Sequence, residues 1–186
     1  MSELDVDRLL AENLPRLRGF VRLRAGAMVR AMEGDSDIVQ SVCREVLEHR
    51  ERFRHGGEEG FRRWLYTSVM RKLGHRADYY RAQKRDQARV RAFDDEAAGQ
   101  VLEGYRGIAT PSGVLRQREE LERIEAAFDA LPEHYREVIT LARIAELPQA
   151  EIAAQTGRSE GSVRMLLYRG LERLSELLER PAPPQP

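Results

Sequence analysis

Ten basic side chains are concentrated in one stretch of the chain, between residues 61 and 91. The same stretch holds only two acidic side chains, so it carries eight excess positive charges although the whole chain is neutral. A one-signed block of this kind suits a polyanion, because neutralising phosphates releases counterions and favours binding. The stretch is therefore a candidate nucleic-acid surface, with a solvated helix face as the alternative. Its basic residues are Arg62, Arg63, Arg71, Lys72, Arg76, Arg81, Lys84, Arg85, Arg89 and Arg91.

A second pattern lies between Pro148 and Tyr168, in the sequence PQAEIAAQTGRSEGSVRMLLY. Its small and apolar positions match the packing of a helix-turn-helix, in which two short helices cross at a sharp turn. Gly157 can supply the positive φ that the turn needs. The alternative is a plain helical hairpin. The positions expected in the small core are Ile152, Ala153, Val163, Leu166 and Leu167.

The second helix of this motif has an outward face formed by Arg164, Met165, Tyr168 and Arg169. An arginine can hold a phosphate or bind a guanine edge, a methionine can pack on a thymine methyl group, and a tyrosine can reach a phosphate. This face is therefore a candidate for contacting a DNA groove. In the alternative interpretation Tyr168 packs partly into the core and the two arginines pair with Glu160 and Glu172.

The residue types that enzymes and metal sites need do not occur at useful spacings. The four histidines form no ligand spacing with Cys43 or with acidic pairs, and no glycine-rich phosphate loop follows a strand. No nucleophile has an obvious base partner. We therefore predict no catalytic residues, no metal and no cofactor. The histidines are His49, His55, His75 and His134.

The length and composition are those of a globular protein. A chain of 186 residues with 41% hydrophobic residues can bury a core in one or two domains. A single cysteine cannot form an internal disulfide, and no apolar run approaches the roughly 20 residues of a membrane-spanning helix. The N-terminus lacks the layout of a secretory signal. We expect a cytoplasmic protein without membrane insertion.

Helical periodicity dominates, and no stretch alternates like a strand, which predicts an all-α fold of two small helical domains joined by a flexible linker. In the first domain, residues 1–90, we expect a helix over 6–32 that bends at Pro15. A second helix, capped by Asp35 or Ser36, should run to about Arg52. After a loop over 54–60, a third helix should cover 61–85. The apolar faces expected are Ile38, Val39, Val42, Val46 and Leu47, and then Phe61, Trp64, Leu65, Val69, Leu73 and Ala77.

The apolar period fails after Asp86, and we place the linker at residues 91–111. The second domain, residues 112–180, divides at its prolines. One helix should end near Leu131, and the next should run from Pro132 to about Glu146. A short helix should follow from Pro148 to Gly157, and the last should run from Ser159 to Glu179. Residues 181–186 read as a disordered proline-rich tail.

Taken together, the two domains resemble bacterial sigma factors of the extracytoplasmic-function (ECF) group over nearly the whole chain. The segments DSDIVQSVCREVLEHRERFR and FRRWLYTSVMRKL are similar to region two of the family, the sigma region 2 helix bundle. The segment LPEHYREVITLARIAELPQAEIAAQTGRSEGSVRMLLYRGLERL is similar to region four, the sigma region 4 helix-turn-helix. Two blocks in the family's order are more specific than either block alone.

The resemblance implies a role for each surface. Asp37, Gln40 and Ser41 would dock on the clamp helices of core RNA polymerase, and the first helices of region four would contact the flap. Region two would capture and melt the minus-ten promoter element, while region four would contact the minus-thirty-five element in the major groove. The implied minus-ten residues are Arg54, His55, Arg62, Arg63, Thr67, Met70 and Arg71. The implied minus-thirty-five residues are Ser159, Ser162, Arg164, Met165, Tyr168 and Arg169.

Some positions depart from the family pattern. Ser41 replaces an acidic residue, Cys43 a common aromatic, Arg71 an asparagine and Leu166 an arginine. We interpret Cys43 as a small core hydrophobe. Trp64 could stack on an unpaired base, but its place on the apolar stripe favours the core.

The family resemblance implies core RNA polymerase and promoter DNA as partners, with an anti-sigma factor as a further candidate. Two other classes remain open. A free-standing helix-turn-helix regulator would explain the second domain but not the docking helix with Asp37 and Gln40. A protein-interaction module would make the basic block incidental.

Overall fold

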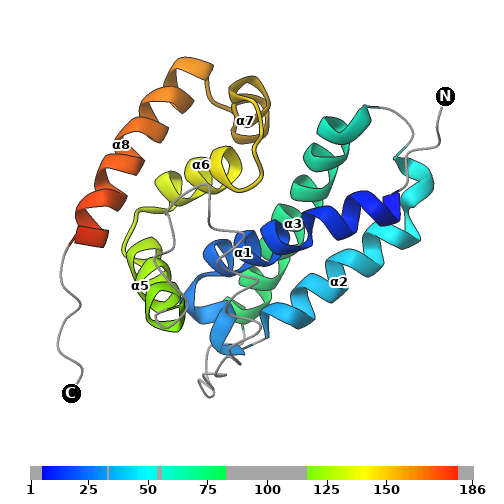
Figure 1. Ribbon diagram of the computed structural model, residues 1–186, viewed down its shortest axis with the longest axis horizontal. Coiled ribbons are helices and arrows are strands. Elements are labelled where there is room, and N and C mark those ends of the chain that lie inside the picture. The colour runs from blue at the N-terminus through cyan, green and yellow to red at the C-terminus, as the bar shows by residue number, and fades with distance from the viewer. Residues whose placement is uncertain (1–5, 33, 54–55, 83–116, 180–186) are drawn as a thin grey trace.

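The computed structural model describes residues 6–32, 34–53, 56–82 and 117–179 (Figure 1). These residues form α-helices and one short 3₁₀ helix, with no strand among them, so the all-α prediction is confirmed. The N-terminal half contains α1 (Val6–Met32), α2 (Asp35–Glu48), a 3₁₀ turn (Arg50–Arg52) and α3 (Gly57–Ala82). The C-terminal half contains α5 (Gln117–Asp129), α6 (Glu133–Arg143), α7 (Gln149–Thr156) and α8 (Glu160–Glu179). The predicted linker and tail lie outside the described residues.

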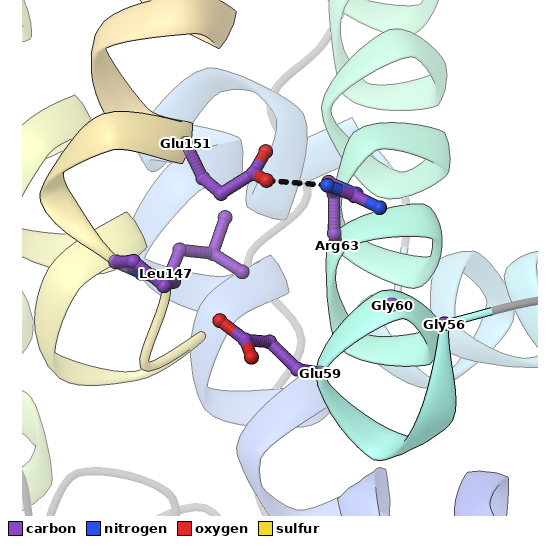
Figure 2. A pocket seen from close by; sticks show the side chains of 7 residues that line it. Gly56, Glu59, Gly60, Arg63, Leu147 and Glu151 are labelled. Atoms are coloured by element: carbon purple, nitrogen blue, oxygen red, sulfur yellow. Dashed lines mark hydrogen bonds and ion pairs between the residues drawn. The ribbon is translucent and has the colours of Figure 1, made fainter.

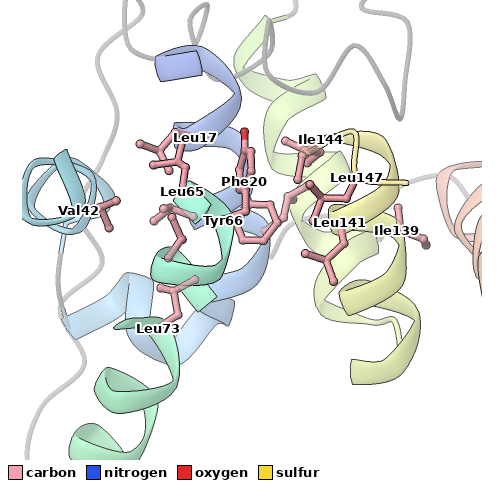
Figure 3. Packing of buried hydrophobic residues seen from close by; sticks show 14 of the residues in the cluster. Leu17, Phe20, Val42, Leu65, Tyr66, Leu73, Ile139, Leu141, Ile144 and Leu147 are labelled. Atoms are coloured by element: carbon pink, nitrogen blue, oxygen red, sulfur yellow. The ribbon is translucent and has the colours of Figure 1, made fainter. Parts of the chain in front are cut away.

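In the N-terminal half, α1 packs against α2 and α3. Leu17, Val42, Leu65 and Leu73 are buried between these helices (Figure 3). The apolar stripe predicted for α3 is confirmed at Phe61, Leu65, Val69 and Leu73, while Trp64 and Ala77 are half-buried against the same core.

The helix α1 is interrupted at Gly26 and not at the predicted Pro15. Gly26 has φ 68° and ψ 165°, a conformation outside the helical region, whereas Pro15 lies within the helix. Glycine adopts this backbone without the strain that a Cβ would cause. The periodic apolar pattern continues across Gly26, which is why the break is not visible in the sequence.

Both ends of α2 differ from the prediction. The N-cap is Gly34, whose carbonyl accepts hydrogen bonds from the backbone N–H groups of Asp37 (3.0 Å) and Ile38 (3.2 Å), so neither Asp35 nor Ser36 caps this helix. The helix ends at Glu48 rather than near Arg52. Leu47, predicted on the apolar face, is 40% exposed.

The predicted loop over 54–60 is wrong in its second half, because α3 begins at Gly57. The backbone N–H of Gly60 donates to the carbonyl of Gly56 at 2.9 Å and closes the first turn. Arg54 and His55 lie outside the described residues. The described part of α3 ends at Ala82, so Arg85 also falls outside it.

The proline boundaries of the C-terminal half are confirmed, with Pro132 as the N-cap of α6 and Pro148 as the N-cap of α7. The end predicted for α6 at Glu146 is wrong. The helix stops at Arg143, Glu146 takes a left-handed φ of 52°, and the N–H of Leu147 returns to the carbonyl of Leu141 at 3.0 Å. A glutamate does not predict this conformation, since glycine and asparagine are the usual residues at a left-handed position after a helix.

The two halves pack on each other, because α1 contacts α5 and α6. Their apolar side chains form one continuous cluster. Figure 3 shows Phe20 of α1 and Tyr66 of α3 facing Leu141, Ile144 and Leu147 from α6 and the turn after it. We call this packing of the two halves the closed arrangement. In it the α6–α7 segment, residues 146–155, lies beside α3.

Candidate nucleic-acid interface

The helix-turn-helix consists of α7, a turn at Gly157, and α8. Gly157 has φ 66° and ψ 28°, the left-handed conformation predicted for it, and Ile152, Ala153 and Val163 are buried. Ser159 caps α8, since its Oγ accepts a hydrogen bond from the backbone N–H of Ser162 at 3.2 Å. Leu166 and Leu167 are half-buried on the same core.

The outward face of α8 is open to solvent. Met165 is 48% exposed and Tyr168 is 66% exposed, which excludes the alternative in which Tyr168 packs into the core. Arg164 and Arg169 are exposed beside them, and the Nε of Arg164 donates to Gln149 Oε1 at 3.4 Å. Ser159 and Ser162 are also exposed. All six predicted minus-thirty-five residues therefore lie on or beside one accessible helix face.

Close packing of α6 and α8 holds this face in place. A Cβ on Gly170 would lie 3.1 Å from Ile139 Cδ1 and 3.2 Å from Tyr135 Cβ, so the two helices meet where α8 carries no side chain. Buried Leu174 and Val163 extend the same contact along α8.

The predicted minus-ten residues do not all share one environment. Arg63, Thr67 and Arg71 are exposed along α3, Met70 is half-buried, and Arg62 is partly buried toward the C-terminal half. Arg54 and His55 lie outside the described residues.

The C-terminal half supplies partners to three of these side chains. Arg63 forms an ion pair with Glu151 of α7 (Figure 2), and Gln155 Nε2 donates to Thr67 Oγ1 at 3.0 Å. Arg62 lies 3.4 Å from Glu146 Oε2.

A small cavity of about 190 Å³ opens between the halves beside the Arg63–Glu151 pair. Figure 2 shows Glu59 of α3 across this cavity from Leu147. Its lining residues are Gly56, Glu59, Gly60, Arg63, Leu147, Pro148 and Glu151.

Arg71 is held by α2 rather than by the C-terminal half. Its Nη2 lies 2.6 Å from Glu45 Oε1, and Lys72 Nζ lies 3.0 Å from Glu45 Oε2. The hydrogen bond from Lys72, followed by the charges of Lys72 and Arg71, lowers the pKa of the Glu45 carboxyl below its ordinary value. Lys72 Nζ also donates to the carbonyl of Ser41 at 2.8 Å, so α3 is tied to the predicted docking helix.

The predicted docking face of α2 is accessible. Asp37 and Gln40 are exposed one turn apart, and Ser41 is half-buried. Leu47 and Arg44 are exposed on the same helix. The apolar period of α2 predicted that Leu47 is buried, so its exposure is not visible in the sequence.

Cys43 is half-buried against the core, as predicted. Burial raises the pKa of its thiol above the ordinary value, although a backbone hydrogen bond and the charge of Arg18 act in the opposite direction. Its thiol is therefore held in the protonated form at neutral pH.

Trp64 packs on aromatic neighbours instead of standing free. Its ring stacks on Phe53 with centroids 5.7 Å apart and an interplanar angle of 20°. Phe61 lies edge-on to Trp64 at 6.1 Å. These contacts support the core interpretation of Trp64.

A buried ion-pair network joins the two halves. Arg22 of α1 binds Glu125 of α5 through two hydrogen bonds, one of them from Nη2 to Oε2 at 2.7 Å, and its Nη1 lies 3.0 Å from Asp35 Oδ1. The Arg22 and Glu125 side chains are only 9% and 10% exposed. The energetic value of such a pair depends on both partners being present, since a single buried charge is costly. No local sequence pattern could link residues so far apart in the chain.

Tyr66 is the second feature of this interface that the sequence did not reveal. Its ring is fully buried, with its centroid 4.8 Å from that of Phe20. Among the described residues its hydroxyl has no hydrogen-bond partner. Burial raises the pKa of Tyr66 far above its ordinary value, so the hydroxyl remains neutral. An unsatisfied buried hydroxyl costs about 1–3 kcal/mol.

The described residues contain no group of three or more histidine, cysteine or acidic side chains placed to hold a metal ion. No helix within the described ranges is long and apolar enough to cross a membrane.

Comparisons with known proteins concern both halves. The family model for sigma-70, region 4, matches residues 121–174, which contain the helix-turn-helix. The chain is 29% identical over 157 residues to the ECF RNA polymerase sigma factor SigD of Mycobacterium tuberculosis, spanning 84% of this chain and 69% of that protein. It is 28% identical over 153 residues to the RNA polymerase sigma factor SigV of Bacillus subtilis, spanning 82% of this chain and 80% of that protein.

A solved structure has the same fold. The sigma factor RpoE of Bartonella quintana, in complex with the anti-sigma factor NepR, superimposes with a TM-score of 0.64 at 21% identity. The match covers 95% of this chain and 99% of that one, so the similarity extends over the helices of both halves.

Proposed function

Because the chain is an RNA polymerase sigma factor of the ECF group, we propose that it binds core RNA polymerase and directs initiation at promoters selected by its two halves. The region 4 match and the similarity to ECF sigma factors over more than four fifths of the chain are the basis for this premise. We assign residues 1–90 to region two, 91–111 to the linker and 112–180 to region four.

The observation that carries the proposal is the open face of α8 within the segment that matches region four. Arg164, Met165, Tyr168 and Arg169 project from a capped helix in a helix-turn-helix. A recognition helix of this kind enters the major groove with its N-terminal residues toward the bases. We propose that this face, with Ser159 and Ser162, contacts the minus-thirty-five element.

For region two we propose that the polar face of α3 captures the opened minus-ten strand. Arg62, Arg63 and Arg71 supply positive charge for phosphates, and Thr67 and Met70 lie along the same helix. The proposed minus-ten contacts also include Arg54 and His55, which precede this helix in the sequence.

We propose that α2 docks on the polymerase clamp helices through Asp37, Gln40 and Ser41. The exposure of Asp37 and Gln40 one turn apart supports this assignment, and exposed Leu47 adds apolar area farther along the helix. The first helices of region four, α5 and α6, are the proposed contact for the polymerase flap.

The proposal includes an anti-sigma partner, because the RpoE relative was solved with NepR. We place the protein in the cytoplasm and assign it no enzymatic activity of its own. A free-standing regulator would use α8 but would give the accessible docking face of α2 no role.

Co-purification with core RNA polymerase from the protein's own host, followed by run-off transcription on host promoter fragments, tests the proposal. We expect stable association and promoter-dependent transcripts. The Asp37→Ala/Gln40→Ala variant should lose core affinity without losing helical content, whereas Glu172→Ala/Glu179→Ala, at exposed positions in the C-terminal part of α8, should keep both. Equal core affinity of both variants would reject the docking assignment.

A further inference from the structure

The α6–α7 segment, residues 146–155, lies against the face of α3 that is proposed to capture the minus-ten strand. Its contacts are polar and specific. Glu151 pairs with Arg63, Gln155 donates to Thr67 Oγ1 at 3.0 Å, and Glu146 lies 3.4 Å from Arg62. The groups proposed for DNA are therefore engaged by another part of the same chain.

The chemistry of these contacts resembles that of a nucleic-acid strand. A carboxylate that pairs with an arginine occupies the guanidinium N–H donors that would otherwise bind a phosphate oxygen. Glu146 adds a second negative charge, which lies 2.7 Å from Arg16 Nη1 as well as near Arg62. The side-chain amide of Gln155 donates to the Thr67 hydroxyl, which could otherwise bond to a base or a sugar. The segment thus presents two carboxylates and one amide where the strand would lie.

Buried contacts behind this polar layer hold the two halves together. The Arg22–Glu125 pair is enclosed at the α1–α5 contact, and Phe20 and Tyr66 pack against Ile144 and Leu147 (Figure 3). Separation of the halves would expose both the ion pair and these apolar side chains.

The same interface contains features that favour opening. The Tyr66 hydroxyl has no hydrogen-bond partner among the described residues, and separation of the halves would give it water. The polar pairs above it are partly exposed, with Arg63 at 50% and Glu146 at 44%, so salt screens them. The closed arrangement is therefore one that a competing ligand can open.

We propose that residues 146–155 act as an internal competitor that occupies Arg62, Arg63 and Thr67 in the free protein, so that capture of a single strand requires the two halves to separate. The competition is selective, because the outward face of α8 stays exposed in the closed arrangement. Duplex contact by region four does not need the opening. The inference rests on the proposed function of α3, and its test does not use polymerase.

The first test measures binding of a fluorescein-labelled 15-nucleotide oligothymidylate to the full chain by fluorescence anisotropy. The Glu146→Gln/Glu151→Gln variant removes the carboxylates that pair with Arg62 and Arg63, the two arginines of the competed site, so we expect several-fold tighter binding. The slope of log K against log salt should become steeper by about 1.4, since each neutralised phosphate on a single strand contributes about 0.7.

The matched control is Glu119→Gln/Glu179→Gln, which changes the net charge equally at exposed positions on α5 and at the end of α8. It should leave the slope unchanged. Equal slopes and affinities for the two double variants would overturn the inference.

The second test prevents the halves from separating. Glu59 and Pro148 line the cavity between the halves, so Glu59→Cys/Pro148→Cys in a Cys43→Ser background can be joined with a reducible bis-maleimide. Oligothymidylate affinity should fall several-fold after cross-linking and recover after reduction. Unchanged affinity through this cycle would overturn the inference.

Core polymerase binding by the unmodified protein distinguishes failure of the internal competitor from failure of the proposed sigma-factor function. If the protein binds core polymerase but the oligothymidylate affinities do not differ, the internal competitor is rejected and the sigma assignment stands. If the affinities differ as expected but core polymerase does not bind, the closed arrangement stands and the proposed function is rejected.

Discussion

The polar face of α3 and the outward face of α8 are both candidate DNA surfaces, but they differ in what lies against them. On α3, Arg63 and Thr67 contact Glu151 and Gln155 of the opposite half. On α8, Met165 and Tyr168 are exposed to solvent. The difference arises because α7 supports α8 on one side and presents its polar side chains to α3 on the other. The short helix α7 therefore supports the α8 surface and covers part of the α3 surface.

The largest expected effect is on stability and follows from removing the Arg22–Glu125 ion pair, which joins the two halves. Separation of the halves would make the α3 and α8 surfaces equally accessible. Arg22→Ala removes the arginine that pairs with the buried Glu125 carboxylate, and removing one member of such a pair costs about 3–5 kcal/mol. Urea denaturation should show this loss in the free energy of unfolding. Arg22→Met/Glu125→Leu, which removes both charges while keeping volume, should recover most of it. A double variant as unstable as the single one would show that the pair is not what stabilises this contact.

A smaller effect should be confined to the α8 surface. Arg164→Ala should reduce initiation from a cognate promoter by about 1–3 kcal/mol if this side chain contacts a base. Run-off transcription on promoters with and without a minus-thirty-five element measures it. Arg173→Ala lies on the same helix, where Arg173 pairs with Glu176 at 2.5 Å, and should have little effect. Equal activity of both variants on every cognate promoter would remove Arg164 from the recognition surface.

Tyr66→Phe should sharpen the contrast between the surfaces by favouring the closed arrangement. It deletes a buried hydroxyl without a partner while keeping the ring against Phe20, so the free energy of unfolding should rise by about 1 kcal/mol. Thermal unfolding followed by circular dichroism measures the change. Tyr66→Ala is the opposing variant, because it removes the ring as well and should destabilise. A lower melting temperature for Tyr66→Phe would mean that the hydroxyl is satisfied.

The smallest effect concerns Glu45, which holds Arg71 on the α3 surface from within the N-terminal half. Its carboxyl pKa is lowered in the folded state, so its contribution to stability is present above its unfolded value near 4.5. That contribution is lost as pH falls below 4.5, through the folded pKa. Glu45→Gln should narrow the stability difference between pH 6 and pH 3 by less than about 1 kcal/mol. The exposed control Glu48→Gln should leave the difference unchanged.

Local patterns in the sequence predicted the features that depend on neighbouring residues. The spacing of Phe61, Leu65 and Val69 gave the buried face of α3, and Gly157 between two short apolar patterns gave the turn of the helix-turn-helix. Each depends on backbone preference or helical period within one or two turns. Pro132 and Pro148 likewise set helix starts through their own fixed φ.

The missed features depend on contacts between distant residues. Arg22 meets Glu125 across the interface, and a surface charge gives the sequence no sign of a buried partner. Leu47 keeps the apolar period of α2, but no helix among the described residues buries it. Gly26 and Glu146 take positive φ values of 68° and 52°, which the apolar period of the sequence does not reveal.

The absence of a side chain at Gly170 sets how closely α8 lies against α6. A methyl group there would meet Ile139 and Tyr135 at 3.1–3.2 Å and would push α8 away from α6 by a few tenths of an ångström. Arg164 lies six residues away, roughly 9 Å along the axis. A slight tilt at this pivot is therefore carried to the exposed side chains of α8 that are proposed to contact the groove, where hydrogen bonds to base edges tolerate little displacement. Under the proposed assignment, discrimination between promoter sequences depends in part on a glycine that is itself buried against α6.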